Sequence, residues 1–229
     1  MTTRGRAAGW WVDVLMVAGF AATTALLALP AVLNLDLWVR DFADAHRPAV
    51  FDTVLQWVNR LGNGGPLAVI TLIIALTVAR RRRTLWPVAP VVAAFLAIGF
   101  VIMPLKQYFH RAAPHSVLPD DVEVRLFSQP GFGLSYPSGH AVNTIVWYGV
   151  IALLLAGWFA ARPAWHRALR IAPPIIVGFT ATYLGWHWLT DMVAGLFLGV
   201  LIDRVLMRVS WPGLTEPARP ELVGSDVRP

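Results

Sequence analysis

The chain of 229 residues is 57% hydrophobic and only 14% charged, with a formal net charge of +6. Soluble domains contain about 25% charged residues, so this composition favours an integral membrane protein. The absence of cysteine excludes disulfide bonds, thiolate metal ligands and a cysteine nucleophile. Nucleic acid binding is not expected, because no basic stripe alternates with exposed aromatic residues.

Six apolar segments approach the length of about 20 residues that a helix needs to cross the hydrocarbon core. They predict an all-α, polytopic membrane protein with a single domain over residues 1–210 and a disordered, Pro-rich tail over 211–229. A tight turn near His187–Asp191 must separate the last two segments, which together are too long for one crossing. The segments are Trp10–Pro30, Gly64–Ala79, Leu85–Leu105, Ala141–Ala161, Ile171–Leu189 and Thr190–Met207.

The basic residues indicate how these segments are oriented in the membrane. If the N-terminus is cytoplasmic, 13 of the 19 arginine and lysine residues lie inside and 6 lie outside. The positive-inside rule favours this orientation. We therefore expect a multi-pass protein of the plasma membrane, with both termini cytoplasmic and the loop of residues 106–140 on the outer face.

An amphipathic helix is expected after Pro48, within the first outer loop of residues 31–63. Its apolar side chains recur at i, i+3, i+4 and i+7, as they do on one helix face. A helix of this kind can lie in the membrane interface or pack on the bundle, and both can hold at once. The recurring residues are Phe51, Val54, Leu55, Val58 and Leu61.

Residues that bind anions or transfer protons gather at the outer ends of the predicted spans. Lys106, the only lysine in the chain, ends the third span, and its compact ammonium group suits a point contact with an oxyanion. Pro137–His140 begins the fourth span, where free N–H groups and the helix dipole favour anions. His187 and Asp191 are spaced i and i+4, so on a helix the carboxylate would fix the tautomer of the ring.

Three stretches resemble the signature motifs of the type 2 phosphatidic acid phosphatases, the superfamily of lipid phosphate phosphatases and vanadium haloperoxidases. They are KQYFHRAAP from Lys106, YPSGHA from Tyr136 and TATYLGWHWLTD from Thr180. The corresponding family motifs read Lys-x6-Arg-Pro, Pro-Ser-Gly-His and Ser-Arg-x5-His-x3-Asp. The resemblance implies an outward-facing active site that acts, without metal or cofactor, on the phosphate head of an isoprenoid, glycerolipid or glycolipid.

The resemblance also implies a role for each matching residue. His187 would attack phosphorus and form a phosphohistidine, with Asp191 orienting its ring. His140 would protonate the leaving oxygen and then activate the water that releases phosphate. The groups that would bind the non-bridging oxygens are Lys106, Ser138 and the N–H of Gly139, within the motif that Pro137 begins.

The chain departs from the family pattern at both arginines that grip phosphate. Ala113 and Ala181 stand at those positions, and Thr180 stands where the family has serine. Haloperoxidase activity is therefore not expected, because vanadate binding depends on the same arginines. Arg111 and Arg125 are the candidates to supply the missing charge, and His110, His115 and Gln129 are candidate hydrogen-bond donors.

Three functions stay open at this point. The intact His–His–Asp set predicts a phosphatase for a lipid phosphomonoester or pyrophosphate. The missing arginines suit a transferase or diesterase instead, because a phosphodiester carries one negative charge and a monoester nearly two. A non-catalytic protein that binds or moves anionic lipids is the third. In each case the expected partners are a lipid phosphate and the bilayer, and the sequence does not set the oligomeric state.

Overall fold

A computed structural model describes residues 9–116, 133–159, 162–212 and 214. Over these ranges the chain is helical and contains no strand, which confirms the all-α prediction. The elements are α2 (Trp10–Leu26), α3 (Pro30–Ala45), α4 (Ala49–Asn59), η1 (Arg60–Gly62), α5 (Gly64–Arg82), η2 (Trp86–Val88), α6 (Ala89–Phe109), α7 (Gly139–Leu154), α8 (Ala156–Phe159), α9 (Pro163–Tyr183) and α10 (Leu189–Arg208).

Helix α7 is the centre of the bundle and contacts α5, α6, α9 and α10. Its apolar side chains point inward on more than one face, as expected of a helix surrounded by others. Helix α10 approaches α7 closely through a Gly-x3-Gly pattern, because a Cβ at Gly195 would lie 2.6 Å from the Ser138 carbonyl oxygen and one at Gly199 would lie 3.1 Å from the Val142 Cα. The fully buried side chains of α7 include Val142, Val146 and Val150.

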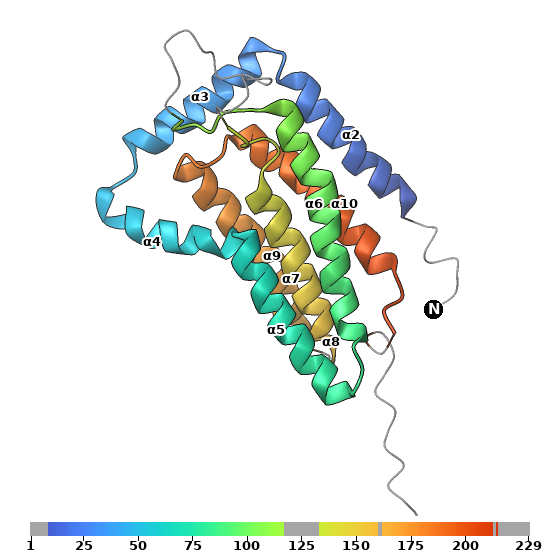
Figure 1. Cartoon of the computed structure of the whole chain (residues 1–229). Coiled ribbons are helices and arrows are strands. Elements are labelled where there is room, and N and C mark those ends of the chain that lie inside the picture. The colour runs from blue at the N-terminus through green and yellow to red at the C-terminus, as the bar shows by residue number, and fades with distance from the viewer. Residues whose placement is uncertain (1–8, 117–132, 160–161, 213, 215–229) are drawn as a thin grey trace, which may run out of the picture.

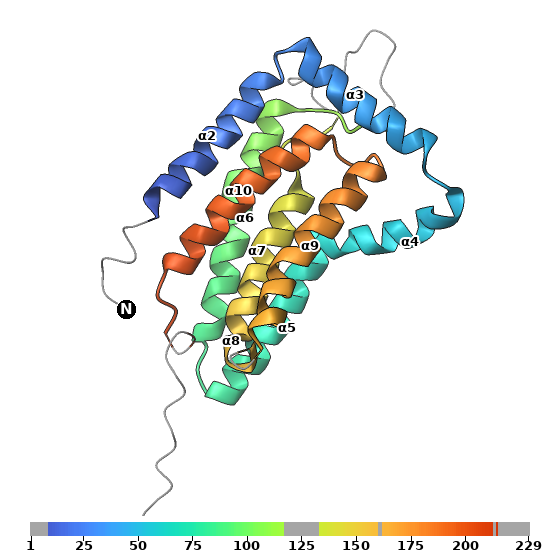
Figure 2. The same cartoon turned by 180° about the vertical axis from the view of Figure 1, so that it is seen from behind.

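The two ends of the bundle differ in the chain segments that meet there. Helices α6 and α9 end, and α7 and α10 begin, at the end covered by α3 (Figures 1 and 2). The start of α2 and the end of α10 lie together at the opposite end, where Arg204 donates to Asp13 at 2.8 Å and to the Gly9 carbonyl at 2.8 Å. All motif residues named above therefore come to one end of the molecule.

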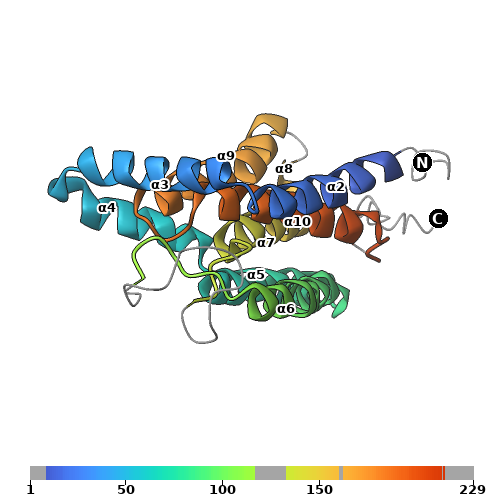
Figure 3. The same cartoon turned by 90° about the horizontal axis from the view of Figure 1, so that it is seen from above.

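Helix α3 covers the end of the bundle where the motif residues lie, whereas α2 runs down the side of the bundle beside α10 (Figures 1 and 2). Seen from above, α2 and α3 run nearly in one line across the bundle, while α5 and α6 lie to one side (Figure 3). Helices α3 and α4 diverge from a corner near Pro48 (Figure 1). On α4, Phe51 and Trp57 are exposed, whereas Asn59 is buried against the bundle. One face of α4 therefore packs on α9, and the position of its exposed apolar face in the membrane interface stays a prediction.

Hydropathy and length alone identify fewer crossings than the six predicted. Among the described residues, Gly64–Arg82 and Trp86–Phe109 are long and apolar enough, with mean hydropathies of 1.4 and 2.5. Helices α2 and α3 pass the test only as a pair bent by 91°, and α7 is apolar but shorter, at 16 residues. The chain is a helical membrane protein, and six spans stay a prediction.

Two predicted segment boundaries were wrong. The fifth segment, placed at Ile171–Leu189, runs instead over Pro163–Tyr183, because Pro163 starts the helix and the Arg170 charge is paired with Asp203 inside the bundle. The stretch after Pro30, expected as part of a loop, forms α3 with that proline in its first turn.

The core also extends past residue 210, where the tail was expected to begin. Trp211 and Leu214 are buried, with 7% of their surfaces exposed, and Trp211 donates to the Leu206 carbonyl at 3.0 Å. Residues 215–229 of the predicted tail lie outside the described part of the chain.

We predict that the end of the bundle where the motif residues lie faces the outside of the cell. The chain contains no cysteine, so single cysteines can be introduced cleanly. A cysteine at the exposed Asp41 on α3 should react with an impermeant maleimide in intact cells, and one at the exposed Arg82 on α5 should react only after permeabilisation. The reverse labelling pattern would overturn the orientation.

Candidate active site

A cavity of about 370 Å³ lies at the end of the bundle where the motif residues meet, which is called the active end below, and several of those residues line it. The end of α6, the start of α7 and the turn after α9 each supply part of its wall. Gly62–Gly64, between α4 and α5, close one side. The full lining consists of Gly62, Asn63, Gly64, Lys106, Ala113, Leu134, Ser135, Gly139, His140, Asn143, Trp186 and His187.

Two histidine rings and a carboxylate form a chain at the base of this cavity. Nδ1 of His140 lies 3.2 Å from Nε2 of His187. Nδ1 of His187 lies 3.5 Å from Oδ2 of Asp191, a carboxylate that is fully buried. Nδ1 of His187 is buried and makes no hydrogen bond in the resting site. Because the nearby carboxylate can only accept, it favours the tautomer with the proton on Nδ1, which leaves the Nε2 lone pair facing Nδ1 of His140.

His187 reaches this position from a turn and not from a helix. Helix α9 ends at Tyr183 and α10 begins at Leu189, which confirms the turn expected near His187–Asp191 and means that the two residues do not share a helix face. The turn closes because the backbone N–H groups of Trp186 and His187 donate to the Ala181 carbonyl, at 2.9 and 3.2 Å. Gly185 has a φ of 68°, a left-handed conformation that favours glycine.

The Pro-Ser-Gly-His stretch begins α7 as predicted, but its serine is turned away from the cavity. The Ser138 hydroxyl accepts from the Ala141 N–H at 3.3 Å as a helix cap, and the side chain is fully buried. Its backbone N–H donates to the Asp191 carbonyl at 3.0 Å, which ties the starts of α7 and α10 together. Gly139 follows at the cavity wall, where a Cβ would lie 3.6 Å from Cε of Lys106.

Lys106 is the cation that lines the cavity among the described residues. Its ammonium group donates to the Leu134 carbonyl. That leaves further N–H donors for an anion beside Gly139, since a lysine carries three. Pro137 and Ser138, although parts of the same motif, do not line the cavity.

Arg111, a candidate phosphate ligand, is instead the centre of a buried ion cluster. Its guanidinium donates to Asp191 at 2.6 Å and to Asp36 at 2.7 Å, and only 1% of its surface is exposed. Asp36 also accepts the backbone N–H of Thr190 at 3.0 Å. Arg111 therefore holds the Asp191 carboxylate and is not part of the cavity lining.

Comparison with known proteins assigns the fold. The family model of the PAP2 superfamily matches residues 85–213, more than half of the chain. The chain belongs to the PAP2 superfamily. Its structure superposes with a TM-score of 0.72 on the crystal structure of a transmembrane PAP2 type phosphatidylglycerolphosphate phosphatase from Bacillus subtilis, at 22% identity over 86% of this chain and 94% of that one.

Two curated relatives of the PAP2 chain are also named as phosphatases. Phosphatidylglycerophosphatase B of Bacillus subtilis is 26% identical over 186 residues, which cover 80% of this chain and 87% of that protein. Undecaprenyl-diphosphatase of Sulfolobus acidocaldarius is 37% identical over 79 residues. This second match spans only 34% of the present chain and 35% of the Sulfolobus protein.

Ala113 and Ala181, at the positions where the resemblance expects arginines, occupy different surroundings. Ala113 lines the cavity, so its side chain leaves space that a ligand can use. Ala181 is fully buried and packs against Ala141 and Met192, behind the cavity wall. The two substitutions therefore do not have the same effect: one shapes the cavity and the other shapes the packing behind it.

The other candidate donors do not meet in this cavity. His115 contacts Asp44 at 3.0 Å, on the outer side of the His187 turn. His110 is the C-cap of α6 with a φ of 46°, and it is not part of the cavity lining. Arg125 and Gln129 lie outside the described residues.

Sequence reasoning missed three residues that support the site. Asp36 and Thr190 hold Arg111 from two sides, the Thr190 hydroxyl accepting from it at 2.7 Å. Asn59, at the end of α4, places its amide nitrogen 3.4 Å from Nε2 of His140. The only signal in the sequence was that each of these polar residues lies among apolar neighbours in a helical segment.

A buried tyrosine fastens α2 to the segment that leads into the site. The Tyr136 hydroxyl and the Thr24 hydroxyl are 2.6 Å apart, and the Tyr136 ring contacts Phe109 edge-to-face at 5.1 Å. Burial raises the pKa of Tyr136 to about 12, so the phenol stays neutral at physiological pH. The segment before α7 is thereby fixed against both α2 and α6.

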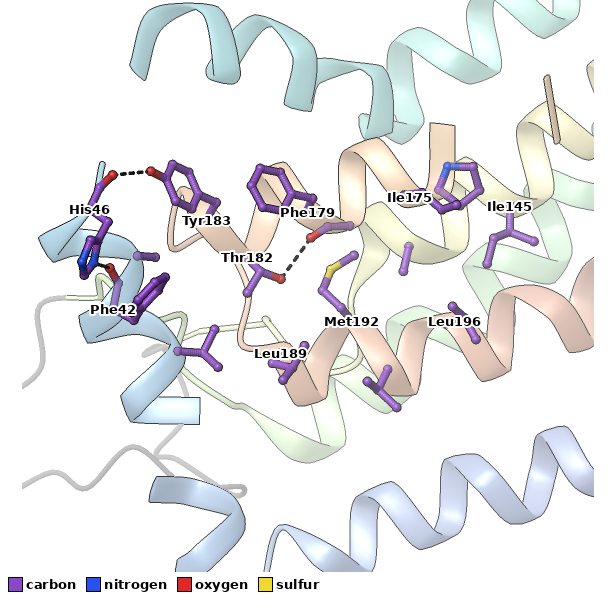
Figure 4. A pocket seen from close by; sticks show the side chains of 16 residues that line it. Phe42, His46, Ile145, Ile175, Phe179, Thr182, Tyr183, Leu189, Met192 and Leu196 are labelled. Atoms are coloured by element: carbon purple, nitrogen blue, oxygen red, sulfur yellow. Dashed lines mark hydrogen bonds between the residues drawn. The ribbon is translucent and has the colours of Figure 1, made fainter. Parts of the chain in front are cut away.

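A second, apolar cavity of about 610 Å³ lies between α3, α7, α9 and α10. Phe42 on α3, Phe179 on α9, and Met192 and Leu196 on α10 point into it (Figure 4). It shares no lining residue with the cavity of the histidines.

Among the described residues, no three His, Cys, Asp or Glu side chains converge as a metal site.

Proposed function

We propose that this protein is a membrane phosphatase that removes the phosphate or pyrophosphate head group of a lipid. The observation that carries the proposal is the contact of His140 with His187 at 3.2 Å, backed by Asp191 at 3.5 Å, in a cavity that Lys106 lines. Membership of the PAP2 superfamily and the phosphatase names of the relatives support the same reaction class.

In the proposed reaction, Nε2 of His187 attacks phosphorus and forms an N–P bond as the bond from phosphorus to the lipid oxygen breaks. Protonated His140 donates its Nδ1 proton to that oxygen and releases the lipid alcohol. Water then attacks phosphorus and gives a proton to Nδ1 of His140, and the N–P bond breaks to release phosphate. General acid and base help of this kind contributes about 10²–10⁴-fold to the rate.

The resting contact between the two rings means that the phosphoryl group binds by separating them. A tetrahedral phosphate then lies between Nε2 of His187 and Nδ1 of His140, beside Lys106 and the N-terminus of α7. Preorganised charge and N–H groups of this kind stabilise the phosphoryl transition state more than covalent chemistry does. Asp191, held by Arg111, stabilises the positive charge on His187 while the N–P bond forms.

A lipid is the substrate class that suits the surroundings of the cavity. Helices α3 and α4 expose large apolar side chains, among them Trp38, Phe42, Phe51 and Trp57. Side chains of this kind at a helix surface suit the boundary between bilayer and water. A phosphate at the end of α7 and a hydrocarbon tail in the bilayer can therefore belong to one molecule.

A second candidate function is transfer or hydrolysis at a lipid phosphodiester. Ala113 supplies no charge to the cavity, so Lys106 is its cation among the described residues. One cation balances the single negative charge of a diester more completely than the charge of nearly two on a monoester. In the transferase version, an alcohol takes the place of water in the second step.

We predict that the two histidines have separable effects on a trapped intermediate. Wild-type protein mixed with a radiolabelled lipid phosphate and quenched in alkali should carry label on histidine. His187→Ala should carry none and show no turnover, because it lacks the nucleophile. His140→Ala should also show no lipid turnover, and Asp191→Asn should retain a small fraction, because the carboxylate only orients.

The matched control is His166→Ala, which removes a histidine near the start of α9, at the opposite end of the bundle. Its labelling and turnover should equal those of the wild type. Undiminished turnover in His187→Ala would rule out the phosphohistidine mechanism. Label that moves to an added alcohol in preference to water would select the transferase version.

We predict that Ala113→Arg changes which head group is accepted. A guanidinium in the cavity adds a charged hydrogen bond worth about 1.5–3 kcal/mol, so kcat/KM for a short-chain lipid monoester should rise by about tenfold or more. A bulkier diester should react more slowly, because the new side chain fills the space beside it. Kinetics with one monoester and one diester in the same detergent measure both effects.

Ala113→Leu is the control, since it fills similar space without charge and should slow both substrates. An equal gain with leucine and with arginine would contradict the electrostatic reason. Ala181→Arg should not give the same gain, because Ala181 is fully buried against Ala141 and Met192 and the site has no partner for the charge.

A further inference from the structure

We propose that Asn59 and Thr180 are positioning residues that keep His140 correctly oriented through both of its proton transfers. The inference rests on the proposed function, because it assigns these residues to the acid and base steps of His140. Neither residue touches the reacting phosphate. They act on the far side of the His140 ring, away from His187.

The amide of Asn59 is buried between His140 and Thr180. Its nitrogen lies 3.4 Å from Nε2 of His140, and its oxygen lies 3.2 Å from the Thr180 hydroxyl. Asn59 is 1% exposed and Thr180 is 2% exposed, so neither group can turn to water for a partner. Gly62 permits this close packing, because a Cβ there would lie 2.8 Å from Cδ2 of His140.

In the resting site, the hydrogen bonds run in one direction from Thr180 to Asp191. The carboxylate places the His187 proton on Nδ1, so Nε2 of His187 accepts from Nδ1–H of His140. Nε2 of His140 is then a lone pair, which accepts from the amide nitrogen of Asn59. The amide oxygen of Asn59 accepts the hydroxyl proton of Thr180.

Catalysis requires the opposite arrangement around His140. Before the first step, Nε2 of His140 takes up a second proton from water or from the acidic phosphate monoester. Nδ1 then gives its proton to the leaving oxygen and later takes one from water, so Nε2 carries its proton through both steps. An amide oxygen must then face Nε2, and a half-turn of the Asn59 amide supplies it. The amide nitrogen now donates to the Thr180 hydroxyl, whose own proton goes to the Val177 carbonyl at 3.2 Å.

Asn59 and Thr180 can therefore pair with Nε2 of His140 whether or not it carries a proton, and no polar group of the three residues is left unpaired. An unpaired buried donor or acceptor costs about 1–3 kcal/mol, so either pattern would be disfavoured with an apolar side chain at Asn59. Thr180 is suited to its part because a hydroxyl both donates and accepts. This gives a physical role to the hydroxyl residue at the position where the family motif has serine.

The test compares the two chemical steps in purified full-length Asn59→Leu and Thr180→Val. An aryl phosphate has a leaving group that departs without a proton, so its phenol should still appear in a rapid burst as His187 is phosphorylated. The following turnover should slow by about 10–100-fold, because water activation needs His140 in its correct tautomer. With a lipid alkyl phosphate, the burst should vanish and kcat should fall while KM changes little.

Two controls accompany these variants. Gln56→Leu removes an amide from the exposed face of the same helix, where it donates to Asp52, and should behave as wild type. Thr180→Ser keeps the hydroxyl and should recover most of the loss seen in Thr180→Val. Equal slowing of burst and turnover, or wild-type rates in both variants, would overturn the inference. Absence of phosphohistidine in the wild-type protein would instead overturn the proposed function, and the inference with it.

Discussion

The buried ion cluster of Arg111, Asp36 and Asp191 is the interaction on which the active end of the molecule depends. It joins the segment after α6, the middle of α3 and the first turn of α10. A guanidinium presents several N–H donors in one plane, so it can bind two carboxylates at once, which an ammonium does less well. Removing the cation would leave two buried carboxylates without a counter-charge, at a cost of about 3–5 kcal/mol.

The ion cluster that stabilises this end of the bundle also includes Asp191, the carboxylate that lies against the proposed nucleophile His187. Asp191 uses one oxygen for Arg111 and the other for the Trp188 N–H, at 3.1 Å, and His187 lies 3.5 Å from the second oxygen. Two contacts other than the one with the histidine therefore hold the carboxylate in place. The Arg111 guanidinium lies 5.4 Å from the centre of the Trp188 ring, which closes the cluster from solvent.

The sequence predicted the helical membrane fold and the gathering of motif residues at one end, because apolar run lengths and motif spacing are local properties. It did not predict α3, whose mixture of apolar and charged residues follows Pro30 without a long apolar run. It predicted a turn near His187–Asp191 but extended the preceding helix to Leu189, whereas α9 ends at Tyr183 and the turn that contains Gly185 carries His187. The i, i+4 spacing still brings ring and carboxylate together, for a different geometric reason.

The functions of the arginines could not be inferred from the sequence, because they depend on distant partners. Arg111 finds its partner Asp36 at a separation of 75 residues, and nothing local to either residue signals the pair. In the sequence, Ala113 and Ala181 both depart from the family pattern at an arginine position. The structure separates the two positions, since one lines the cavity and the other is buried behind it.

A double-mutant cycle between Arg111 and Asp36, read out as unfolding free energy in detergent, tests the central claim most directly. The variants are Arg111→Leu, Asp36→Asn and their combination. If the cluster holds the active end together, Arg111→Leu alone should be strongly destabilising, and the pair should show a coupling energy of about 1–3 kcal/mol. Additive effects of the two substitutions, with Arg111→Leu as stable as the wild type, would contradict it.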